Sequence, residues 1–397
     1  MTCRRPTSRL STPRLGVLDF HPIQYHTPLY QKLAQRGQVR LDVLYFTDHG
    51  HRETIDPGFG VPVAWDIDLL SGYCHKFLAT CDRSPSSPSQ ARTLARWIKS
   101  HDAIVIHGYS HPYMLFAIAA CRTYNIPYLL RGDSGPPANS TGLRLRLRNV
   151  VVRLAVVGSA DCLAIGRLNE DFYRQYGARH VTFAPYSVDD ERFARMPPVR
   201  RRELLSQWGL DDKLPVIMFC GKIYAGKRPL DIVAAINLLS RKVNALFVGD
   251  GVQAKELRES LTPGSGAITG FVNQKELPAY YHAADILVLP SQAEKWGLVI
   301  NEAMAAGTFP VASDRVGAVP DLVEGVGEVY PCGDIESLAK ALDRALAQIK
   351  NPESRDRMRR HASRYSLERT AVAFETAALA ASADSKHHRS LATAKDA

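Results

Sequence analysis

Two glutamates eight positions apart carry the clearest chemical signal in this sequence. Glu294 follows an apolar, strand-like run, and Glu302 lies in a short helix-like run that stops at Gly307, with Gly297 between the two acids. Carboxylates can bind sugar hydroxyls, and a helix start can bind phosphate through its unpaired amides and its dipole. The arrangement therefore predicts a site for a sugar nucleotide.

The helix start between these acids is expected at Trp296, Gly297 and Leu298, whose N–H groups would have no partner within the helix. Glu294 precedes this start and Glu302 lies about one turn beyond it, so both acids can face one ligand. Acidic side chains are also favourable at helix starts for electrostatic reasons. A simple capping role is therefore the structural alternative for Glu294.

A second candidate site is the loop that begins at Gly221, directly after an apolar run. Gly221, Gly226 and Lys227 nearly match a phosphate-binding P-loop, but that motif requires Ser or Thr where this chain has Arg228. Because arginine cannot coordinate Mg²⁺, a P-loop NTPase is disfavoured. Lys222 and Lys227 instead suit a diphosphate held without a metal ion, through charge-assisted contacts. A solvated, lysine-rich loop is the alternative.

Two weaker signals lie in the same half of the chain. Gly249 follows an apolar run, where a glycine allows close backbone approach. Phe271 and Val272 end a segment whose backbone could face a flat base. The glycines near them lack the spacing of a dinucleotide-binding fingerprint, so a Rossmann dehydrogenase is poorly supported.

Length and charge set the outer limits. A chain of 397 residues favours two or more domains, and a hydrophobic content of 45% supports packed cores. Residues 1–186 hold 22 Lys and Arg against 13 Asp and Glu, which gives +9, whereas residues 187–397 hold 28 against 27, which gives +1. The basic excess of the first half suits phosphorylated substrates, anionic lipid or nucleic acid; a merely soluble basic face is the alternative.

The cysteines and the N-terminal segment bear on location. The seven cysteines are scattered and form no CxxC pair, which indicates reduced thiols in a cytosolic protein. No apolar run reaches the roughly 20 residues of a membrane span, and the N-terminal segment has charges without an apolar core, unlike a secretory signal. We expect a cytoplasmic protein, with a peripheral position at the inner membrane face left open.

Strand-like and helix-like runs alternate along the chain, which predicts parallel βαβ units with function at the carboxyl ends of the strands. Strands are expected at 14–19, 39–46, 103–107, 128–131, 162–165, 215–221, 245–251 and 286–291, and helices at 27–36, 91–100, 112–124, 143–157 and 229–239. The pattern breaks near 185–198 and then resumes. We therefore expect an α/β protein with two doubly wound domains facing across a cleft.

The expected domain limits follow from this break. They are a disordered arm at 1–13, an N-terminal domain at 14–186, a linker at 187–200, a C-terminal domain at 201–364, a final helix at 365–381 and a disordered tail at 382–397.

The C-terminal half resembles the retaining GT-B glycosyltransferases of group 1, often called family 4. The similar segments are GKIYAGKRP, VGDG, ITGFV, AYYHAADILVLPS, EKWGLVINEAMAAGTFPVASD and GAVPDLVEG, in the family order over residues 215–325. The resemblance implies a GT-B fold with two Rossmann-like domains. It also implies transfer of a sugar, of the hexosyltransferase type, from a nucleotide-diphosphate donor with retention of anomeric configuration. The final helix would cross back to the first domain.

The resemblance assigns roles to several residues. The first acid of the family's E-x7-E motif contacts the donor sugar and the second binds the ribose, which corresponds to Glu294 and Glu302 here. Lys222 and Lys227 correspond to the basic pair on the diphosphate, although the family usually has Arg first, and Lys loses bidentate geometry. The resemblance implies no metal ion and no other cofactor. Further donor-binding residues would be Gly221, Gly249, Phe271, Val272, Trp296, Gly297 and Leu298.

The N-terminal half departs from the family. The loop after the first strand has no glycine, so His21 or Gln24 would have to supply side-chain contacts in its place. Many members have a His near the donor sugar, and Arg131 or Asp133 stands in the matching segment. His107, at the end of the preceding strand, is another candidate for the cleft, although a lone His there is more often structural.

The segment 143–157 is apolar, with four arginines and no acid. It could form a basic amphipathic helix on a membrane surface, or a buried helix with a solvated arginine face. The membrane interpretation fits cell-envelope polysaccharide or glycolipid synthesis, with a lipid-linked or polysaccharide acceptor and no nucleic acid. The acidic pair Asp66 and Asp68 resembles a metal-binding triplet of another fold, and no metal is assigned to it.

Two other functional classes remain open from the sequence. One is a GT-B-fold sugar-nucleotide epimerase, which needs no second acceptor. The other is a basic protein that binds membrane or nucleic acid and carries a degenerate site. The intact acid pair and the paired lysines argue against the second of these.

Overall fold

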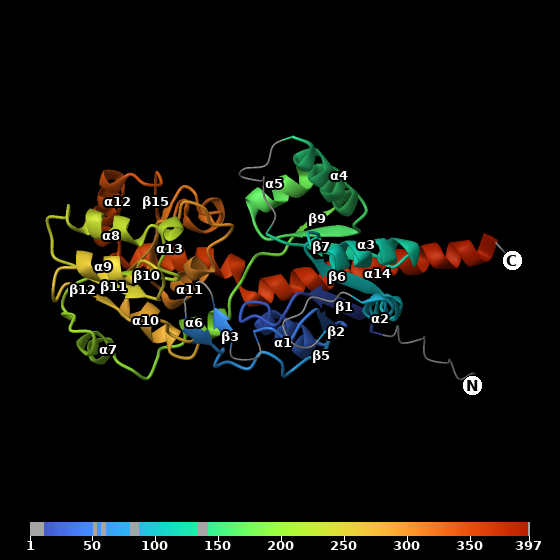
Figure 1. The fold of residues 1–397 in the computed structure, drawn as a ribbon, viewed down its shortest axis with the longest axis horizontal. Coiled ribbons are helices and arrows are strands. Elements are labelled where there is room, and N and C mark those ends of the chain that lie inside the picture. The colour runs from blue at the N-terminus through green and yellow to red at the C-terminus, as the bar shows by residue number, and fades with distance from the viewer. Residues whose placement is uncertain (1–11, 51–53, 57–60, 80–86, 134–141, 396–397) are drawn as a thin grey trace, which may run out of the picture.

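A computed structural model describes residues 12–50, 54–56, 61–79, 87–133 and 142–395, which form two α/β domains joined by a linker and a long C-terminal helix (Figure 1). The expected arm at 1–13 falls mostly outside the described residues. Each domain is a parallel sheet flanked by helices, as the alternating pattern predicts, so the fold class is confirmed.

The N-terminal sheet has seven parallel strands in the order β5-β2-β1-β6-β7-β8-β9. Its strands are β1 (Arg14–Asp19), β2 (Arg40–Tyr45), β5 (Cys74–Phe77), β6 (Ala103–His107), β7 (Tyr128–Arg131), β8 (Asp161–Ala164) and β9 (Val181–Phe183), and a hairpin, β3 (Thr54–Asp56) and β4 (Val61–Val63), stands apart from it. Its helices are α1 (Thr27–Arg36), α2 (Pro88–Lys99), α3 (Pro112–Thr123), α4 (Leu143–Val157) and α5 (Arg167–Gln175).

The C-terminal sheet has six parallel strands in the order β12-β11-β10-β13-β14-β15. They are β10 (Val216–Cys220), β11 (Asn244–Val248), β12 (Gly266–Ile268), β13 (Ile286–Leu289), β14 (Phe309–Ser313) and β15 (Glu328–Tyr330). The surrounding helices and turns are α7 (Arg201–Gln207), η1 (Ala225–Lys227), α8 (Pro229–Ile236), α9 (Ala254–Ser260), α10 (Leu277–Ala283), α11 (Leu298–Ala306), η2 (Val319–Val323), α12 (Ile335–Gln348), α13 (Pro352–Ala362) and η3 (Ser363–Tyr365).

In each sheet the strand order reverses at one point, between β1 and β6 in the first and between β10 and β13 in the second. Ligands of open parallel sheets bind beyond the carboxyl ends of strands at such reversals. The central strands are buried on both faces, as in sheets covered by helices on each side. Their apolar runs therefore form rigid supports for the loops that follow them.

The last helix, α14 (Leu367–Lys395), joins the two domains by packing on the N-terminal one. Ala371 and Phe374 are fully buried in the core made by β1, β2, α1 and their neighbours. The Arg36 guanidinium donates to the Glu375 carboxylate at 2.9 Å. The C-terminal end of the chain thus completes the core of the first domain (Figure 1).

Two of the expected limits need correction. The final helix was expected at 365–381 and the tail at 382–397 to be disordered, but α14 continues to Lys395. The polar residues of this extension give no apolar periodicity, while its several alanines favour a helix. The expected linker at 187–200 contains a short helix, α6 (Asp190–Ala194), which packs on α11. Within the described residues, no helix is long and apolar enough to cross a membrane.

Candidate active site

The loop between β13 and α11 is shaped by Gly297. This residue has φ of +100°, and a Cβ placed there would lie 2.8 Å from the Leu289 side chain and 3.2 Å from Val316. Only glycine fits such a position without strain. The helix begins at Leu298, as predicted, so the first amides of α11 are without helical partners.

Glu294 is fixed in the same loop by its main chain. Its N–H donates to the Arg315 carbonyl at 3.3 Å, and its own carbonyl accepts from Gly317 N–H at 2.8 Å. Its side chain forms an ion pair with Lys227, which ends the turn η1. The structure therefore brings together the first acid and the second lysine, which the sequence separates by 67 residues.

Two adjoining cavities lie around the start of α11. The Glu294 cavity, of about 310 Å³, and the Glu302 cavity, of about 330 Å³, share Tyr25, Lys227 and Val299. The volumes are at the low end of the range for small-molecule sites. Both cavities are lined by residues of the two domains, so the site is interdomain.

Glu302 is fully buried in the wall of the cavity that bears its name. The Tyr281 hydroxyl donates to its Oε2 at 2.6 Å, while Oε1 has no hydrogen-bond partner. Burial raises the pKa of Glu302 to about 7, although the Tyr281 bond, the charge of Arg192 and the nearby Tyr25 hydroxyl act in the opposite direction. A buried carboxylate oxygen without a donor is costly unless a ligand supplies one.

The rest of the Glu302 cavity comes largely from strand ends of the C-terminal domain. Gly221, Lys222, Gly249, Phe271 and Val272 all line it, as the sequence predicts for one site. A Cβ on Gly249 would lie 1.9 Å from the Gly221 carbonyl oxygen, so the two strand ends can approach only because no side chain intervenes.

Trp65, from the N-terminal domain, also lines this cavity, with its ring centroid 6.1 Å from that of Phe271. Its position depends on contacts between the domains: Asn273 donates to the Ala64 carbonyl at 2.6 Å, and Lys275 N–H donates to Asp66 at 3.1 Å. Trp65 is not among the predicted site residues, because an isolated Trp in a loop has no periodic pattern around it.

The carboxylates of Asp66 and Asp68 both accept hydrogen bonds from backbone amides. Besides the Lys275 amide on Asp66, the Leu70 and Ser71 amides donate to Asp68 at 3.0 Å. Their carboxylates therefore stabilise the loop and its contact with the second domain.

Arg131 is a structural residue. It is 2% exposed, and its guanidinium donates to the carbonyls of Ala184 at 2.6 Å and Pro185 at 3.3 Å while lying against the rings of Tyr186 and Phe374. It also lines the Glu294 cavity, and its buried Nε has no hydrogen-bond partner among the described residues, so its role in sugar binding stays a prediction.

Asp133 lines the Glu294 cavity with an accessible carboxylate, paired with Lys295 at 3.3 Å. Gln24 lines the Glu302 cavity. The structure thus brings both of these candidates to the site.

The other two cleft candidates lie elsewhere. His21 contacts the Pro22 carbonyl at 3.2 Å and the ring of His49, and it borders neither cavity. His107 lies behind the cavity wall, with Nε2 3.2 Å from the Tyr30 hydroxyl, and burial lowers its pKa to about 3. The loop after β1 turns so that Tyr25 and His26, not His21, reach the cavities.

Trp296 contributes mainly through packing. Its indole is 4% exposed, its N–H donates to Asn301 at 2.9 Å, and its ring meets those of Tyr186 and Tyr365. Little of the side chain is left for a ligand, although the residue borders the Glu294 cavity.

The chain is similar to known glycosyltransferases. Residues 200–365 match the family model of the glycosyl transferases group 1. Alpha-D-kanosaminyltransferase of Streptomyces kanamyceticus is 33% identical over 203 residues, which cover 48% of this chain and 50% of that protein. D-inositol 3-phosphate glycosyltransferase of Thermobifida fusca is 32% identical over 268 residues, 61% of this chain and 58% of that protein. The chain spans about half the length of the curated relatives it matches.

Solved structures show how far the fold likeness extends. The structure of Anabaena HepE in complex with UDP has a TM-score of 0.68 at 17% identity, over 90% of this chain and 97% of that one. Because the likeness covers both domains, the whole chain has the GT-B architecture. The family match supports the group 1 glycosyltransferases through the C-terminal domain of this GT-B chain.

Proposed function

We propose that this protein is a retaining glycosyltransferase that takes its sugar from a nucleoside diphosphate donor and requires no metal ion. The nucleoside occupies the Glu302 cavity and the sugar occupies the Glu294 cavity. The observation that carries the proposal is the free Oε1 of buried Glu302, because ribose hydroxyls are donors that would satisfy it.

The diphosphate then lies where the two cavities meet. Lys227 borders both cavities, Lys222 borders one, and the start of α11 adds unpaired amides. These groups stabilise the negative charge that develops as the diphosphate departs. Glu294 exchanges part of its contact with Lys227 for the sugar hydroxyls and so positions the sugar.

In a retaining transfer the acceptor attacks from the face that the diphosphate leaves. We assign no covalent nucleophile. The Anabaena structure is a complex with UDP, which favours a uridine donor as the first to be tried.

The binding test is calorimetry with UDP-, GDP- and ADP-sugars in the presence of EDTA. We expect one of them to bind, and to bind equally well after the chelator is added. Binding of none, or binding that requires a divalent cation, would contradict the donor site as proposed.

Turnover is tested with an isotopically labelled donor, with and without candidate acceptors. A transferase forms product only when acceptor is present, whereas an epimerase forms a new sugar nucleotide without it. Proton NMR of the product anomer then decides between retention and inversion.

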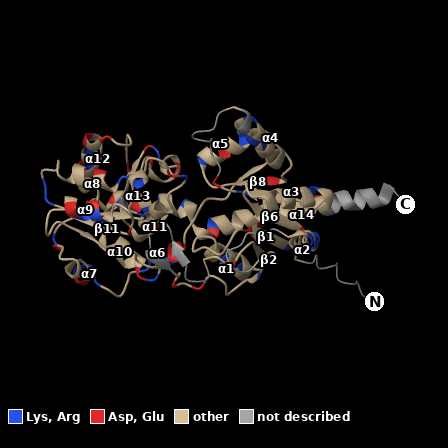
Figure 2. Cartoon of the chain, viewed as in Figure 1, with Lys and Arg blue, Asp and Glu red and all other residues tan. Residues whose placement is uncertain are grey.

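For the acceptor, we propose a lipid-linked or polysaccharide substrate of the cell envelope, reached from an anionic membrane surface on which α4 lies. Leu147, Val150 and Leu154 are 65%, 54% and 57% exposed, and their spacing places them on one face of α4. Arg146 and Arg153 are exposed on the same helix, which has no acidic residue (Figure 2). An apolar face flanked by arginines is typical of helices that bind anionic head groups.

Co-sedimentation with phosphatidylglycerol vesicles tests this surface. A Leu147→Ser/Leu154→Ser variant should lose about tenfold or more in vesicle binding, while Leu238→Ser, at an equally exposed leucine of the C-terminal domain, should bind as the parent does. Equal sedimentation of both variants, or equal binding to neutral phosphatidylcholine, would argue against membrane contact through α4.

A further inference from the structure

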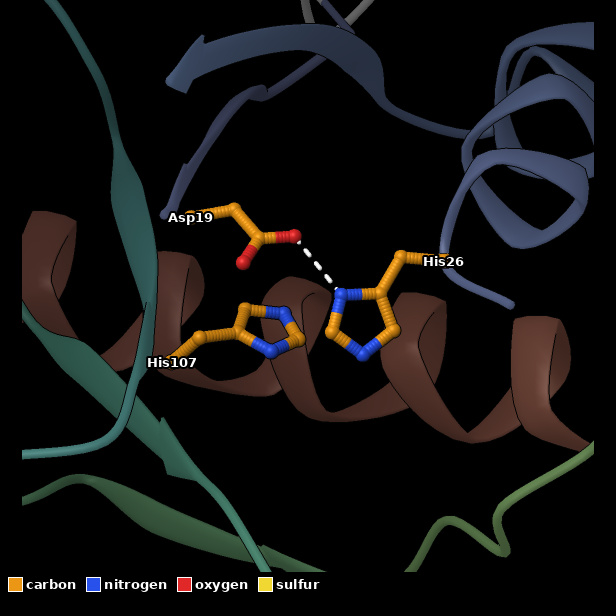
Figure 3. Close-up of side chains that lie close together, drawn as sticks. All are labelled: Asp19, His26 and His107. Carbon is orange, nitrogen blue, oxygen red and sulfur yellow. Dashed lines mark hydrogen bonds and ion pairs between the residues drawn. The ribbon is translucent and has the colours of Figure 1, made fainter. Parts of the chain in front are cut away.

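Asp19, at the end of β1, is the centre of a buried hydrogen-bond network next to the Glu294 cavity. His26 Nδ1 lies 2.7 Å from Asp19 Oδ2, and the Tyr30 hydroxyl donates to the same oxygen at 2.7 Å. The Phe20 N–H donates to Oδ1 at 2.8 Å. Figure 3 shows the side chains of Asp19, His26 and His107 converging from three separate segments.

The Asp19 carboxylate is ionised in this network. Burial alone would raise its pKa, but the opposing attraction of His26 and His107 and the hydrogen bonds from His26 and Tyr30 bring the pKa well below its usual range. An ionised carboxylate only accepts hydrogen bonds. In its neutral form His26 must therefore carry its proton on Nδ1, which leaves a lone pair on Nε2.

The lone pair on Nε2 of His26 takes no part in holding the fold together. Within the described part of the chain, Nε2 makes no hydrogen bond, and it is not among the buried polar atoms left without a partner. The side chain is 15% exposed, and His26 borders the Glu294 cavity. A basic nitrogen thus meets the cavity that also contains Glu294 and Lys227.

His107 cannot present a basic nitrogen to the Glu294 cavity, because it packs against His26 and does not border that cavity. Its ring centroid is 4.6 Å from that of His26, and its Nε2 lies 3.2 Å from the Tyr30 hydroxyl. It supports the network from behind. The oxygens of Asp19 are likewise occupied by donors, so the cluster is a hydrogen-bonded relay with one open end.

We infer that His26 is the general base of the transfer, and that Asp19 is the residue that positions it. This inference rests on the proposed function. His26 Nε2 takes the proton of the acceptor hydroxyl as the acceptor oxygen forms its bond to the anomeric carbon. The bond from that carbon to the diphosphate oxygen breaks, and the leaving diphosphate keeps the electron pair. The proton passes from His26 to solvent after the products depart.

The consequence for the substrate is geometric. The acceptor hydroxyl must enter the Glu294 cavity on the face of the sugar that the diphosphate leaves, within reach of His26 Nε2. In this arrangement the acceptor proton goes to a base of the protein. In a same-face reaction without such a base, the proton would go to the departing phosphate.

The test compares His26→Gln and Asp19→Asn with His180→Gln, an exposed histidine remote from the cavity as a control. General-base removal typically costs about 10²–10⁴ in rate, so we expect His26→Gln to lower kcat within that range. Donor affinity, measured by calorimetry, should change less than about twofold, because His26 does not border the Glu302 cavity in which the nucleoside is placed. Asp19→Asn should lower kcat less, and His180→Gln should act as the parent.

The pH profile separates a base from a merely structural residue. Catalysis by a general base gives a rate that rises with pH, so the rising limb of the kcat profile of the parent should be absent in His26→Gln. The other titratable or charged groups that face this histidine or its cavity are Asp19, Tyr25, Tyr30, His107, Arg131, Asp133, Tyr186, Lys227, Glu294 and Lys295. Added imidazole should restore transfer in His26→Ala, which covers the case in which His26→Gln folds poorly.

The outcomes are distinct from those that test the proposed function. If the parent binds no sugar nucleotide, the proposed function fails. If the parent transfers sugar and His26→Gln does so within threefold and with the same pH profile, only the assignment of the base is overturned. Loss of donor binding in His26→Gln, or tight Zn²⁺ binding that this substitution abolishes, would also overturn it.

Discussion

The two walls of the cleft are built in different ways. The C-terminal wall comes mainly from two short segments, the loop of Lys222 and Lys227 and the stretch from Glu294 to Glu302. The N-terminal wall includes Tyr25 and His26 of one loop, Trp65 of a second loop and Asp133 of a third.

This difference indicates that the C-terminal wall recognises the donor and the N-terminal wall recognises the acceptor. A donor with a common diphosphate can be bound by a compact motif that repeats between relatives, and here that region coincides with the family match. The acceptor side has no such motif, so its residues are identified only once the chain is folded. We therefore expect substitutions in the two walls to have separable effects on donor binding and on transfer.

The largest effect is expected in the C-terminal wall. Lys227→Ala should lower kcat by about 10²–10³, because it removes a cation from the leaving diphosphate and leaves Glu294 without its partner. Glu294→Ala should also lower kcat. Lys255→Ala, at an exposed lysine of the same domain, is the control. Steady-state kinetics that show parent-like rates for both cavity variants would break the comparison, since the C-terminal wall would then be dispensable.

Glu302→Gln should separate donor affinity from stability. Loss of a charged acceptor for ribose hydroxyls should weaken donor binding by about 10–100-fold. The fold should become more stable by about 1–3 kcal/mol above pH 7, because a buried carboxylate without a full set of donors is removed. Calorimetry and thermal melts measure the two effects, and a variant that loses stability would contradict the interpretation of Oε1.

The pH dependence of donor binding should follow Glu302. Its pKa is about 7 in the folded protein against an ordinary 4.5, so the free carboxyl is protonated below pH 7. Since ribose hydroxyls donate to the ionised form, affinity should fall by up to about tenfold for each pH unit below 7. Above pH 7 the ionisation of Glu302 should no longer change the donor affinity.

The same ionisation affects folding with a definite sign. The folded state holds a proton that the unfolded chain releases between about pH 4.5 and 7, so this group's contribution to the free energy of unfolding decreases as pH rises through that window. Calorimetry in buffers of different ionisation enthalpy should detect proton release on donor binding. Glu302→Gln, as the matched control, should release none from this site.

The smallest effect is expected where the N-terminal wall meets the nucleoside. Trp65→Ala should raise the dissociation constant for the donor by about 3–10-fold, because one apolar face beside Phe271 is lost. Trp65→Phe should retain most of the affinity. If Trp65→Ala instead abolishes transfer while donor affinity is unchanged, Trp65 acts in transfer and its assignment to donor binding is wrong.

The sequence predicts the C-terminal half of the site because its signals are local. The glycine before α11, the strand before it and the P-loop-like turn are each contained in fewer than ten residues, and their patterns reflect backbone rules. Eight of the thirteen described sheet strands were predicted to within three residues at either end, since buried parallel strands read as continuous apolar runs. The other five, β5, β9, β12, β14 and β15, were not predicted.

The N-terminal candidates were predicted less well, for a physical reason. Arg131 and His107 end buried strands, where a polar side chain can face either the cleft or the packed interior. Which one it faces depends on the neighbours that long-range contacts supply: Phe374 of α14 lies against Arg131, and Tyr30 of α1 occupies the space beside His107.

The α/β alternation and the two-domain division could be predicted from the sequence alone. So could the presence of two acids and two lysines as candidate site residues on one half of the chain. Only the tertiary structure decided that Lys227 pairs with Glu294, that Trp65 reaches Phe271, and that Asp19 directs His26 toward the cavity. Local backbone preferences are encoded over a few residues and can be read from them. Contacts between strand ends and across domains depend on strand order and on how the domains pack, which no short stretch of sequence contains.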